Sequence, residues 1–504
     1  MTKRVKRTAT IILIAVLALF CGTLSVLSFS SESANAQEKY SDYTNTTVFV
    51  IENEADYVAF ATLYSGKSNS FKGKTVRLYT DIDADKANLY FPNFLGKFEG
   101  NGHFAYNFSS ALFGVFGSSS DKTAVLSDLN FVSDGLAGAA VADINYGKIS
   151  NVSVFGTATL AANAKNAGGG LVNTNYGTIT DCVNATDVVL SSSIIFTYGG
   201  IAYSNASSGN IENSAFLGNV KANSVTTNQF SVAAVAFLNA GTLSGVSVAA
   251  EFIAEGTGTD GVTFYAFTKG ANGDVSTGTL QNSASLIYVS GATVTDSRAA
   301  ATANSYSVIA DGIDTEVLYS VTGDFLTGTA ADLTSLGDKF LYGTGYPVPK
   351  TLFSGEGSEG SPFEINGVAD LFKIKFASCS GNTFSYELTS EINLKNIPQI
   401  SAVSGFTAAS GTVKGNGHAL YNCENSTVFE QGYNLSGNNV GFVFCSGNSL
   451  SGNEGDGYAN ENHDFGKDEV SAELTASKPT GTGTATDPYI ITDASTLKWL
   501  DEKE

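Results

Sequence analysis

The chain contains three histidines, so few of its side chains could act as a general base near neutral pH. His103 and His418 occupy the same place in two copies of one segment, residues 100–107 and 415–422, which favours a structural role for both. His463 lies in an acidic stretch. The spacing shows no Ser-His-Asp or Cys-His arrangement and no histidine metal site. Carboxylates are therefore the remaining candidates for chemistry.

The densest group of carboxylates is Asp81, Asp83 and Asp85. If this segment is a strand, alternation places all three side chains on one face. Such a face could bind Ca²⁺ or supply the acid and the base of a glycoside hydrolase. In the matching segment of the second copy, the third position is Lys395, which favours solvated acidic side chains over a conserved metal site. We expect no cofactor other than calcium, and calcium only at this segment.

The chain contains a short sequence repeat, and the structure that this repeat forms would position any such site. Asparagine and glycine recur together every 30 to 34 residues, and an aliphatic residue follows two positions after each glycine. Short β-branched runs bounded by Gly, Asn and Asp indicate strands with tight corners, and a period in this range indicates stacked repeats. We expect the asparagines to hydrogen-bond to one another along the stack and to corner backbone. The repeat residues are Asn145, Gly147, Asn175, Gly177, Asn205, Gly209, Asn239 and Gly241.

A second, longer repeat divides the chain into two modules. Residues 49–57 are similar to residues 363–371, and residues 100–107 are similar to residues 415–422. Each copy opens with a strand and a short helical stretch, which would cover the open, apolar end of a coil. The sequence therefore predicts an all-β fold: a right-handed parallel β-helix solenoid in two modules, with short strand–helix caps.

Residues 170–182, Gly-Leu-Val-Asn-Thr-Asn-Tyr-Gly-Thr-Ile-Thr-Asp-Cys, resemble the GLUG motif of secreted and surface β-helix proteins of bacteria, whose coil is similar to that of pectate lyases. The copies around Gly209, Gly241 and Gly278 depart from the motif progressively. The resemblance covers about residues 45–450 and implies a pectin-lyase-like coil and an adhesin-like, cell-surface context. It transfers no catalytic residue.

Residues 1–36 have the features of a signal peptide: basic residues, an apolar run at 11–29, and Ala-Asn-Ala before Gln37. The alternative is an uncleaved anchor, because the run is long enough to span a bilayer. We expect a secreted or bacterial cell-surface protein with no transmembrane segment after signal removal. The net charge of −21, which signal removal makes more negative, disfavours nucleic acid as a partner.

Two features of the second half of the chain, a pair of cysteines and the final segment, bear on its predicted organisation. Cys423 and Cys445 are spaced by about one coil turn, so they either pair or remain buried thiols. The last segment repeats the opening of a module and then stops, which leaves truncation or divergence, docking on this chain, or end-to-end self-assembly open. The predicted parts are a β-helix module with GLUG-like repeats at 37–352, a shorter module at 353–450, an acidic linker at 451–479 and an incomplete third module start at 480–504.

The surface composition bears on function. Only 15% of the residues are charged, and the chain has 54 glycines and 22 tyrosines, which suits carbohydrate contact and equally an ordinary coil wall. We predict an adhesin-like protein that binds glycans or a partner cell surface without catalysis. One alternative is a polysaccharide lyase or glycoside hydrolase, although no acid–base group recurs among the repeats. Another is a structural envelope or filament component, since a fold alone does not select a function.

Overall fold

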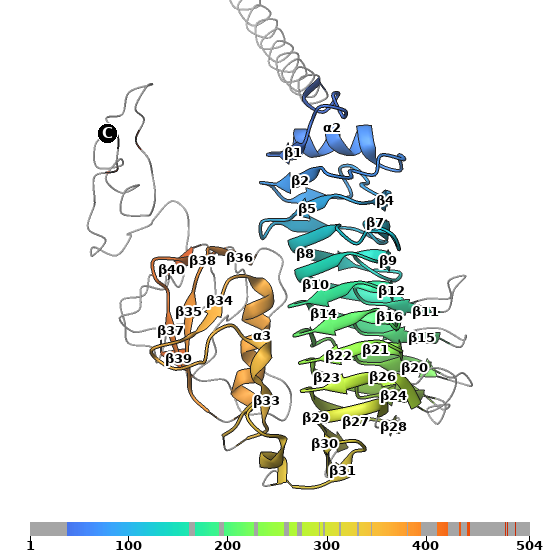
Figure 1. Cartoon of the computed structure of the whole chain (residues 1–504), viewed down its shortest axis with the longest axis vertical. Coiled ribbons are helices and arrows are strands. Elements are labelled where there is room, and N and C mark those ends of the chain that lie inside the picture. The colour runs from blue at the N-terminus through green and yellow to red at the C-terminus, as the bar shows by residue number, and fades with distance from the viewer. Residues whose placement is uncertain are drawn as a thin grey trace, which may run out of the picture.

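The protein forms a tall coil with a smaller unit beside it (Figure 1). The predicted signal peptide and both cysteines of the predicted pair lie outside the residues that the structure describes, as do almost all residues of the linker and of the third module start. The structure, a computed structural model, describes residues 38–160, 167–190, 196–225, 230–256, 262–269, 275–291, 293–295, 298–311, 314–329, 332–343, 345–380, 382–394, 411–421, 433–434, 441–443, 479, 481 and 489.

Two narrow sheets form part of the coil wall, and all their strand pairs are parallel. The asparagine sheet stacks β4 (Phe91–Phe94), β7 (Phe113–Phe116), β9 (Ala142–Asn145), β12 (Val172–Asn175), β16 (Ala202–Asn205), β21 (Ala236–Asn239) and β25 (Thr268–Lys269). The short sheet stacks β11 (Ala167–Gly169), β15 (Phe196–Gly199), β20 (Phe230–Ala233), β24 (Val262–Tyr265) and β28 (Thr293–Thr295).

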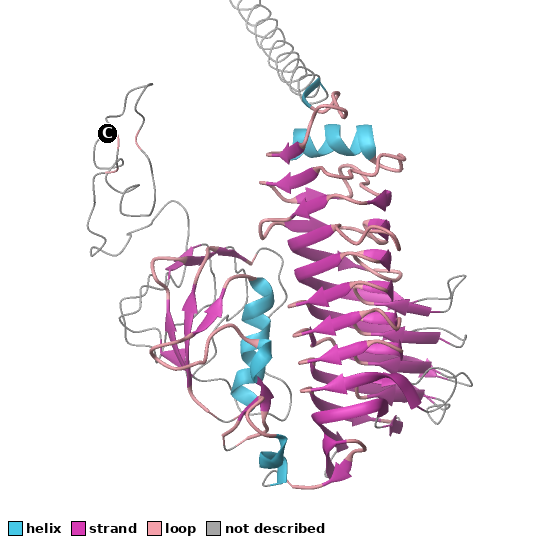
Figure 2. Ribbon diagram, viewed as in Figure 1, coloured by secondary structure: helices cyan, strands magenta, loops and turns pink. Residues whose placement is uncertain are grey.

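The long sheet completes the wall, and its strands pair in parallel down to β29. It contains β1 (Val48–Ile51), β2 (Thr75–Leu78), β3 (Ile82–Asp83), β5 (Lys97–Glu99), β6 (Phe104–Tyr106), β8 (Val125–Asp134), β10 (Lys148–Leu160), β13 (Thr178–Thr180), β14 (Val183–Leu190), β17 (Asn210–Glu212), β18 (Ala215–Phe216), β19 (Val220–Val225), β22 (Thr242–Ser244), β23 (Ser247–Gly256), β26 (Val275–Gln281), β27 (Ala284–Ser290) and β29 (Arg298–Asp311), followed by the antiparallel β30 (Asp314–Thr322) and β31 (Leu326–Thr327). The predicted parallel β-helix is thereby confirmed (Figure 2).

The coil interior contains a column of aliphatic side chains, one from each of five successive turns. Burial of one such side chain stabilises the fold by about 1.5–3 kcal/mol, and only the neighbouring turns can provide that burial. The aligned positions are Ile149, Ile179, Ile211, Leu243 and Leu280, all with 0% exposure.

Helix α2 (Glu54–Tyr64) covers the first turn of the coil (Figure 1). Asn53 caps it by accepting a hydrogen bond from the Asp56 backbone N–H. Phe60 of α2 packs edge-on against Phe49 of β1, with ring centroids 5.8 Å apart. The other end of the coil is closed by the antiparallel strand β30 and by Phe325, which is buried in the same core. The predicted strand–helix cap is therefore present at the first turn.

The smaller unit starts a second parallel coil after a short antiparallel connection. Helix α3 (Val368–Cys379) contacts β34 just as α2 contacts β1. Its two parallel sheets are β34 (Phe363–Ile365), β35 (Phe384–Leu388), β37 (Gly411–Lys414) and β39 (Tyr433–Asn434), and β36 (Ile392–Asn393), β38 (Ala419–Tyr421) and β40 (Gly441–Val443). The connection contains η2 (Asp332–Leu336), β32 (Phe340–Leu341), β33 (Val348–Pro349) and η3 (Lys350–Leu352).

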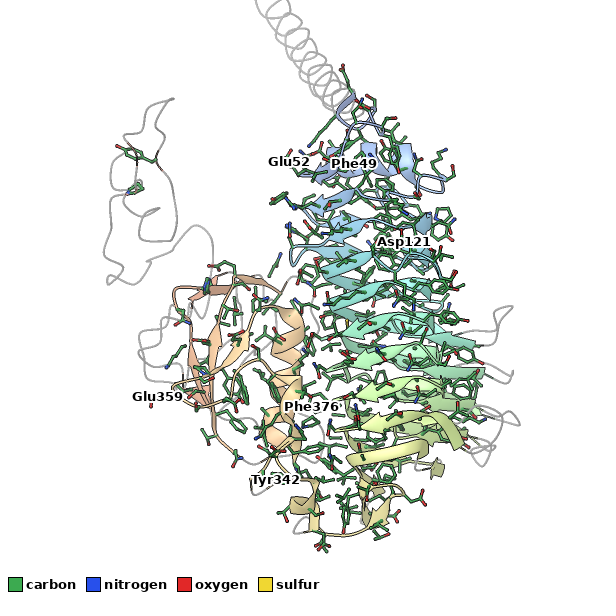
Figure 3. The ribbon with its side chains drawn as sticks, viewed as in Figure 1. Phe49, Glu52, Asp121, Tyr342, Glu359 and Phe376 are labelled. Atoms are coloured by element: carbon green, nitrogen blue, oxygen red, sulfur yellow. The ribbon has the colours of Figure 1, made fainter. Side chains whose placement is uncertain are left out.

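The smaller unit packs against the flank of the first coil through α3. Phe372 of α3 lies against Phe155 of β10, with ring centroids 4.7 Å apart. Lys373 is only 2% exposed, and its Nζ lies 3.7 Å from Asp181 Oδ1 and 3.4 Å from Asp370 Oδ1. Side chains of both units fill the space between them (Figure 3). Besides contacting its own module, α3 thus joins the two modules, a role that the sequence did not predict.

Candidate functional site

The repeated asparagines form a buried ladder through the asparagine sheet. Asn145 Nδ2 donates to Asn175 Oδ1 at 2.8 Å, and Asn175 Nδ2 donates to Asn205 Oδ1 at 2.8 Å. Asn205 Nδ2 then donates to Asn239 Oδ1 at 2.9 Å. The Asn145 and Asn175 side chains also accept from Gly147 N–H at 2.9 Å and from Gly177 N–H at 3.2 Å, so these two amides serve the stack and the corner together. All four side chains are at most 1% exposed and are engaged within the protein.

The repeated glycines lie where the chain passes very close to the turn before it. A Cβ on Gly177 would lie 2.1 Å from the carbonyl oxygen of Gly147, and a Cβ on Gly241 would lie 2.1 Å from that of Gly209. On Gly209 the same atom would lie 2.3 Å from Asn205 Oδ1. These positions therefore exclude a side chain because the stacking itself leaves no room for one.

A second corner follows four residues after each of these glycines. Its residue has a positive φ in successive turns: 51° at Asn151, 56° at Asp181, 47° at Asn213, 63° at Gly245 and 50° at Asn282. Asparagine, aspartate and glycine tolerate this left-handed conformation, whereas most side chains do not. The left-handed backbone at this corner thus explains why the repeat has asparagine, aspartate or glycine there.

The acidic segment does not form the continuous strand that would place three carboxylates on one face. Strand β3 ends at Asp83, and Asp85 lies in the following turn with its N–H bonded to Asp83 Oδ1 at 3.0 Å. Asp83 Oδ1 also accepts from Asn107 Nδ2 at 2.8 Å. Across the described part of the chain, no three His, Cys, Asp or Glu residues are grouped so as to hold a metal ion. Calcium binding at this segment stays a prediction.

His103 and His418 make the same kind of contact in their two modules. His103 Nδ1 lies 3.2 Å from Asp81 Oδ1, and His418 Nδ1 lies 3.7 Å from Glu391 Oε1. Each carboxylate also accepts the backbone N–H of the residue after its histidine, at 3.1 Å for Asp81 and 2.8 Å for Glu391. Because the carboxylate lies beside the ring and accepts the next backbone N–H at a corner, the pair supports a structural role in both modules.

The aromatic stacks on the wall are also structural in form. Tyr146 and Tyr176 stack with ring centroids 4.8 Å apart and planes 10° apart. Tyr203 and Phe237 stack at 5.6 Å and 11°, and the Nζ of Lys269 lies 5.2 Å from the Phe237 centroid. Stacked rings cover one another's faces, and Phe237 is only 4% exposed. These rings therefore offer little flat surface on which a sugar could stack.

Among the described residues, Cys182 is a free thiol, and it lies inside the coil. Its Sγ is 3.2 Å from the Thr180 carbonyl oxygen. Burial raises the pKa of the Cys182 thiol to about 12, so the thiol stays protonated at neutral pH. A protonated, fully buried thiol is no nucleophile for a substrate outside the coil.

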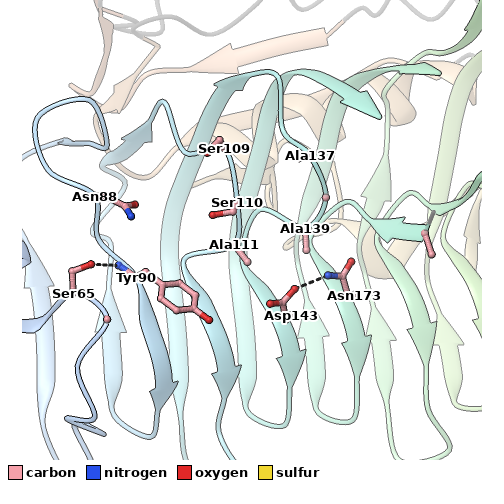
Figure 4. A pocket seen from close by; sticks show the side chains of 13 residues that line it. Ser65, Asn88, Tyr90, Ser109, Ser110, Ala111, Ala137, Ala139, Asp143 and Asn173 are labelled. Carbon is pink, nitrogen blue, oxygen red and sulfur yellow. Dashed lines mark hydrogen bonds between the residues drawn. The ribbon is translucent and has the colours of Figure 1, made fainter. Parts of the chain in front are cut away.

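One hollow on the wall could hold a ligand, and we call it the wall pocket (Figure 4). It lies where loops from successive turns enter the asparagine sheet, and its volume is about 500 Å³. That volume is in the range of small-molecule sites. Its lining residues are Ser65, Gly66, Asn88, Tyr90, Ser109, Ser110, Ala111, Ala137, Gly138, Ala139, Asp143, Ala167 and Asn173.

The polar groups of the wall pocket are held in place by their neighbours. Asn173 Nδ2 donates to Asp143 Oδ1 at 2.7 Å, while Asn173 Oδ1 accepts from Gly169 N–H at 3.1 Å. Ser65 Oγ accepts from Tyr90 N–H at 3.1 Å on the opposite side (Figure 4). Among the described residues, Asp143 is the single carboxylate of the lining. Most glycoside hydrolases place two carboxylates across the scissile bond, and the described lining supplies one of them.

No family model matches the chain, and a search of the curated proteins found no match. Among solved structures, one from Bacteroides ovatus, provisionally described as an immunoglobulin A1 protease, is 15% identical and has a TM-score of 0.33. That comparison covers 60% of this chain and 91% of the other. A likeness at this TM-score carries no argument about activity, and the strand pairing itself defines this protein as a parallel β-helix.

In the described part of the chain, no helix combines the length and the apolar character that crossing a bilayer requires. The apolar run at 11–29 lies outside those residues.

The sequence did not point to the wall pocket. Its lining comes from loops and strands between Ser65 and Asn173, with one to three consecutive residues from each place. No local motif marks such a set. The signal that could have found it is the repeat register, which places Asp143 and Asn173 at equivalent positions of adjacent strands.

Proposed function

We propose that this protein is a secreted or cell-surface β-helix that acts in adhesion or recognition and binds glycans without cleaving them. The proposal draws on the resemblance of residues 170–182 to the GLUG motif of surface β-helix proteins. Residues 1–36 support secretion, because they combine basic residues, an apolar run and a cleavage-like end.

The observation that best supports the proposal is that the described lining of the wall pocket contains one carboxylate, Asp143. Two other groups of side chains serve the coil: the asparagines bond to one another, and the described histidines lie beside corner carboxylates. The wall pocket offers a partner a hollow lined by hydroxyl, amide and small apolar groups. Such groups suit the hydroxyls and C–H faces of sugars.

The test is retention of the purified protein on immobilised polysaccharides of plant, host and bacterial origin, each assayed with and without calcium. We expect retention on a subset of these glycans that calcium does not change. A calcium requirement would instead revive a metal site at Asp81, Asp83 and Asp85. Absence of retention on every glycan would contradict the proposal and favour the structural alternative, an envelope or filament component.

A further inference from the structure

We propose that the wall pocket binds an uncharged sugar unit through two adjacent hydroxyl groups, with the Asp143 carboxylate as their acceptor. This inference rests on the proposed glycan-binding function and adds the site and the chemical class of the ligand.

The charge of the described lining disfavours acidic sugars as ligands. Among the described residues, the lining contains the Asp143 carboxylate and no lysine, arginine or histidine. A ligand carboxylate, sulfate or phosphate would therefore face a negative charge without a cation to offset it. The net charge of −21 for the whole chain adds to this repulsion at longer range.

The geometry of Asp143 suits a pair of hydroxyl donors. Asn173 holds one of its oxygens at 2.7 Å, and Asn173 is itself fixed by the Gly169 N–H. Within the described residues, no group donates to the second oxygen of Asp143. A carboxylate fixed in this way accepts charge-assisted hydrogen bonds with little loss of side-chain freedom on binding. Adjacent hydroxyls on one sugar ring can share such a carboxylate.

The rest of the lining matches the other surfaces of a sugar. Ser109, Ser110 and Asn88 are exposed and can donate to or accept from further hydroxyls. Ala111 and Ala139 are buried small residues that can meet the C–H face of the ring. Figure 4 shows these polar and apolar groups around one hollow, with Tyr90 just before β4 and Asp143 on β9.

The experiment measures binding of the purified protein to neutral polysaccharides (galactomannan, xylan, dextran and mannan) and to polygalacturonate. The neutral polymers are also tested after periodate oxidation, which breaks the C–C bond between adjacent hydroxyl-bearing carbons and converts both to aldehydes. Asp143→Asn removes the charge with little change of shape, and Ser110→Trp fills the pocket from an exposed position. Asp134→Asn is the matched control, because Asp134 is an exposed carboxylate on the long sheet. Thermal unfolding of every variant confirms that it is folded.

We expect wild-type binding to at least one neutral polymer, its loss after periodate treatment, and at least about tenfold weaker binding by Asp143→Asn and Ser110→Trp, since a hydrogen bond to a charged group contributes about 1.5–3 kcal/mol. Asp134→Asn should bind like the wild type. Unchanged binding in both pocket variants would overturn the assigned site while leaving glycan binding intact. Preference for polygalacturonate would overturn the assigned ligand class, and absence of binding to every polymer would remove the proposed function and this inference together.

Discussion

At the scale of single residues, the repeat encodes contacts between turns rather than a reactive group. Asn175 links three turns, because its amide donates to Asn205 Oδ1 and accepts from Asn145 Nδ2. It also accepts from Gly177 N–H at 3.2 Å. A buried polar group that loses its partner costs about 1–3 kcal/mol. The ladder is therefore a strong constraint on sequence without any role for a ligand.

Replacement of Asn175 by alanine should destabilise the protein by about 3 kcal/mol, because the Asn145 amide and the Asn205 carbonyl both lose a buried partner. The measurement is the free energy of unfolding in urea. Asn210→Ala, at a half-buried position of the next turn, is the control and should change stability by less than about 0.5 kcal/mol. Equal effects of the two substitutions would contradict the ladder.

Replacement of Gly177 by alanine tests the close approach of turns independently of hydrogen bonding. The new Cβ would lie 2.1 Å from the Gly147 carbonyl oxygen, so the turns must separate, which should cost at least about 2 kcal/mol. Gly360→Ala is the matched control, because nothing lies within 4 Å of its Cβ position. Thermal unfolding of both variants provides the comparison. A Gly177→Ala protein as stable as the control would show that the turns are not packed this closely.

Most of these contacts of single residues could be predicted from the sequence. The spacing of the asparagines, the glycines and the aliphatic residues is a property of the coil turn, so a period of about 30 residues places them in columns. The acidic segment failed as a continuous strand because a corner follows Asp83, and alternation cannot report where a two-residue strand ends. The wall pocket was missed because its lining is assembled from separate turns.

At the scale of elements, the two strand–helix openings have diverged. Both helices follow the first strand of a coil, but Val58 and Ala59 of α2 stand where α3 has Phe372 and Lys373. Phe372 and Lys373 are the residues that reach Phe155 and Asp181 of the first coil. The sequence predicted the copied module but not this contact, because the apolar outer face of the long sheet is visible only once the strand register is known.

Substitutions in α3 should separate its apolar and ionic contributions. Phe372→Ala should destabilise the contact between modules by about 3–5 kcal/mol, because it leaves a cavity against Phe155. Lys373→Met should be neutral or slightly stabilising, because it removes a costly buried charge while Asp181 and Asp370 keep side-chain exposures of 47% and 23%. Hydrogen exchange of residues 363–388 reports the release of the module. Stronger release in Lys373→Met than in Phe372→Ala would contradict this assignment.

At the scale of the whole molecule, the protein consists of two coils of parallel strands that lie side by side. The first coil presents a long wall of stacked strands. Both ends of the first coil are occupied, by α2 and by the antiparallel strand β30. Turn-on-turn stacking between copies would therefore have to displace one of these elements, and end-to-end assembly through residues 480–504 stays a prediction. The wall, with its pocket on the asparagine sheet, offers a surface to a partner.

The central claim is recognition of glycans without catalysis, and the most direct measurement follows retained protein and new polysaccharide chain ends in the same reaction over an extended incubation at several pH values. The account predicts that the protein stays on one or more neutral polysaccharides while the number of chain ends equals that of a reaction without protein. A steady, protein-dependent rise in chain ends would contradict the account and identify an enzyme on this coil.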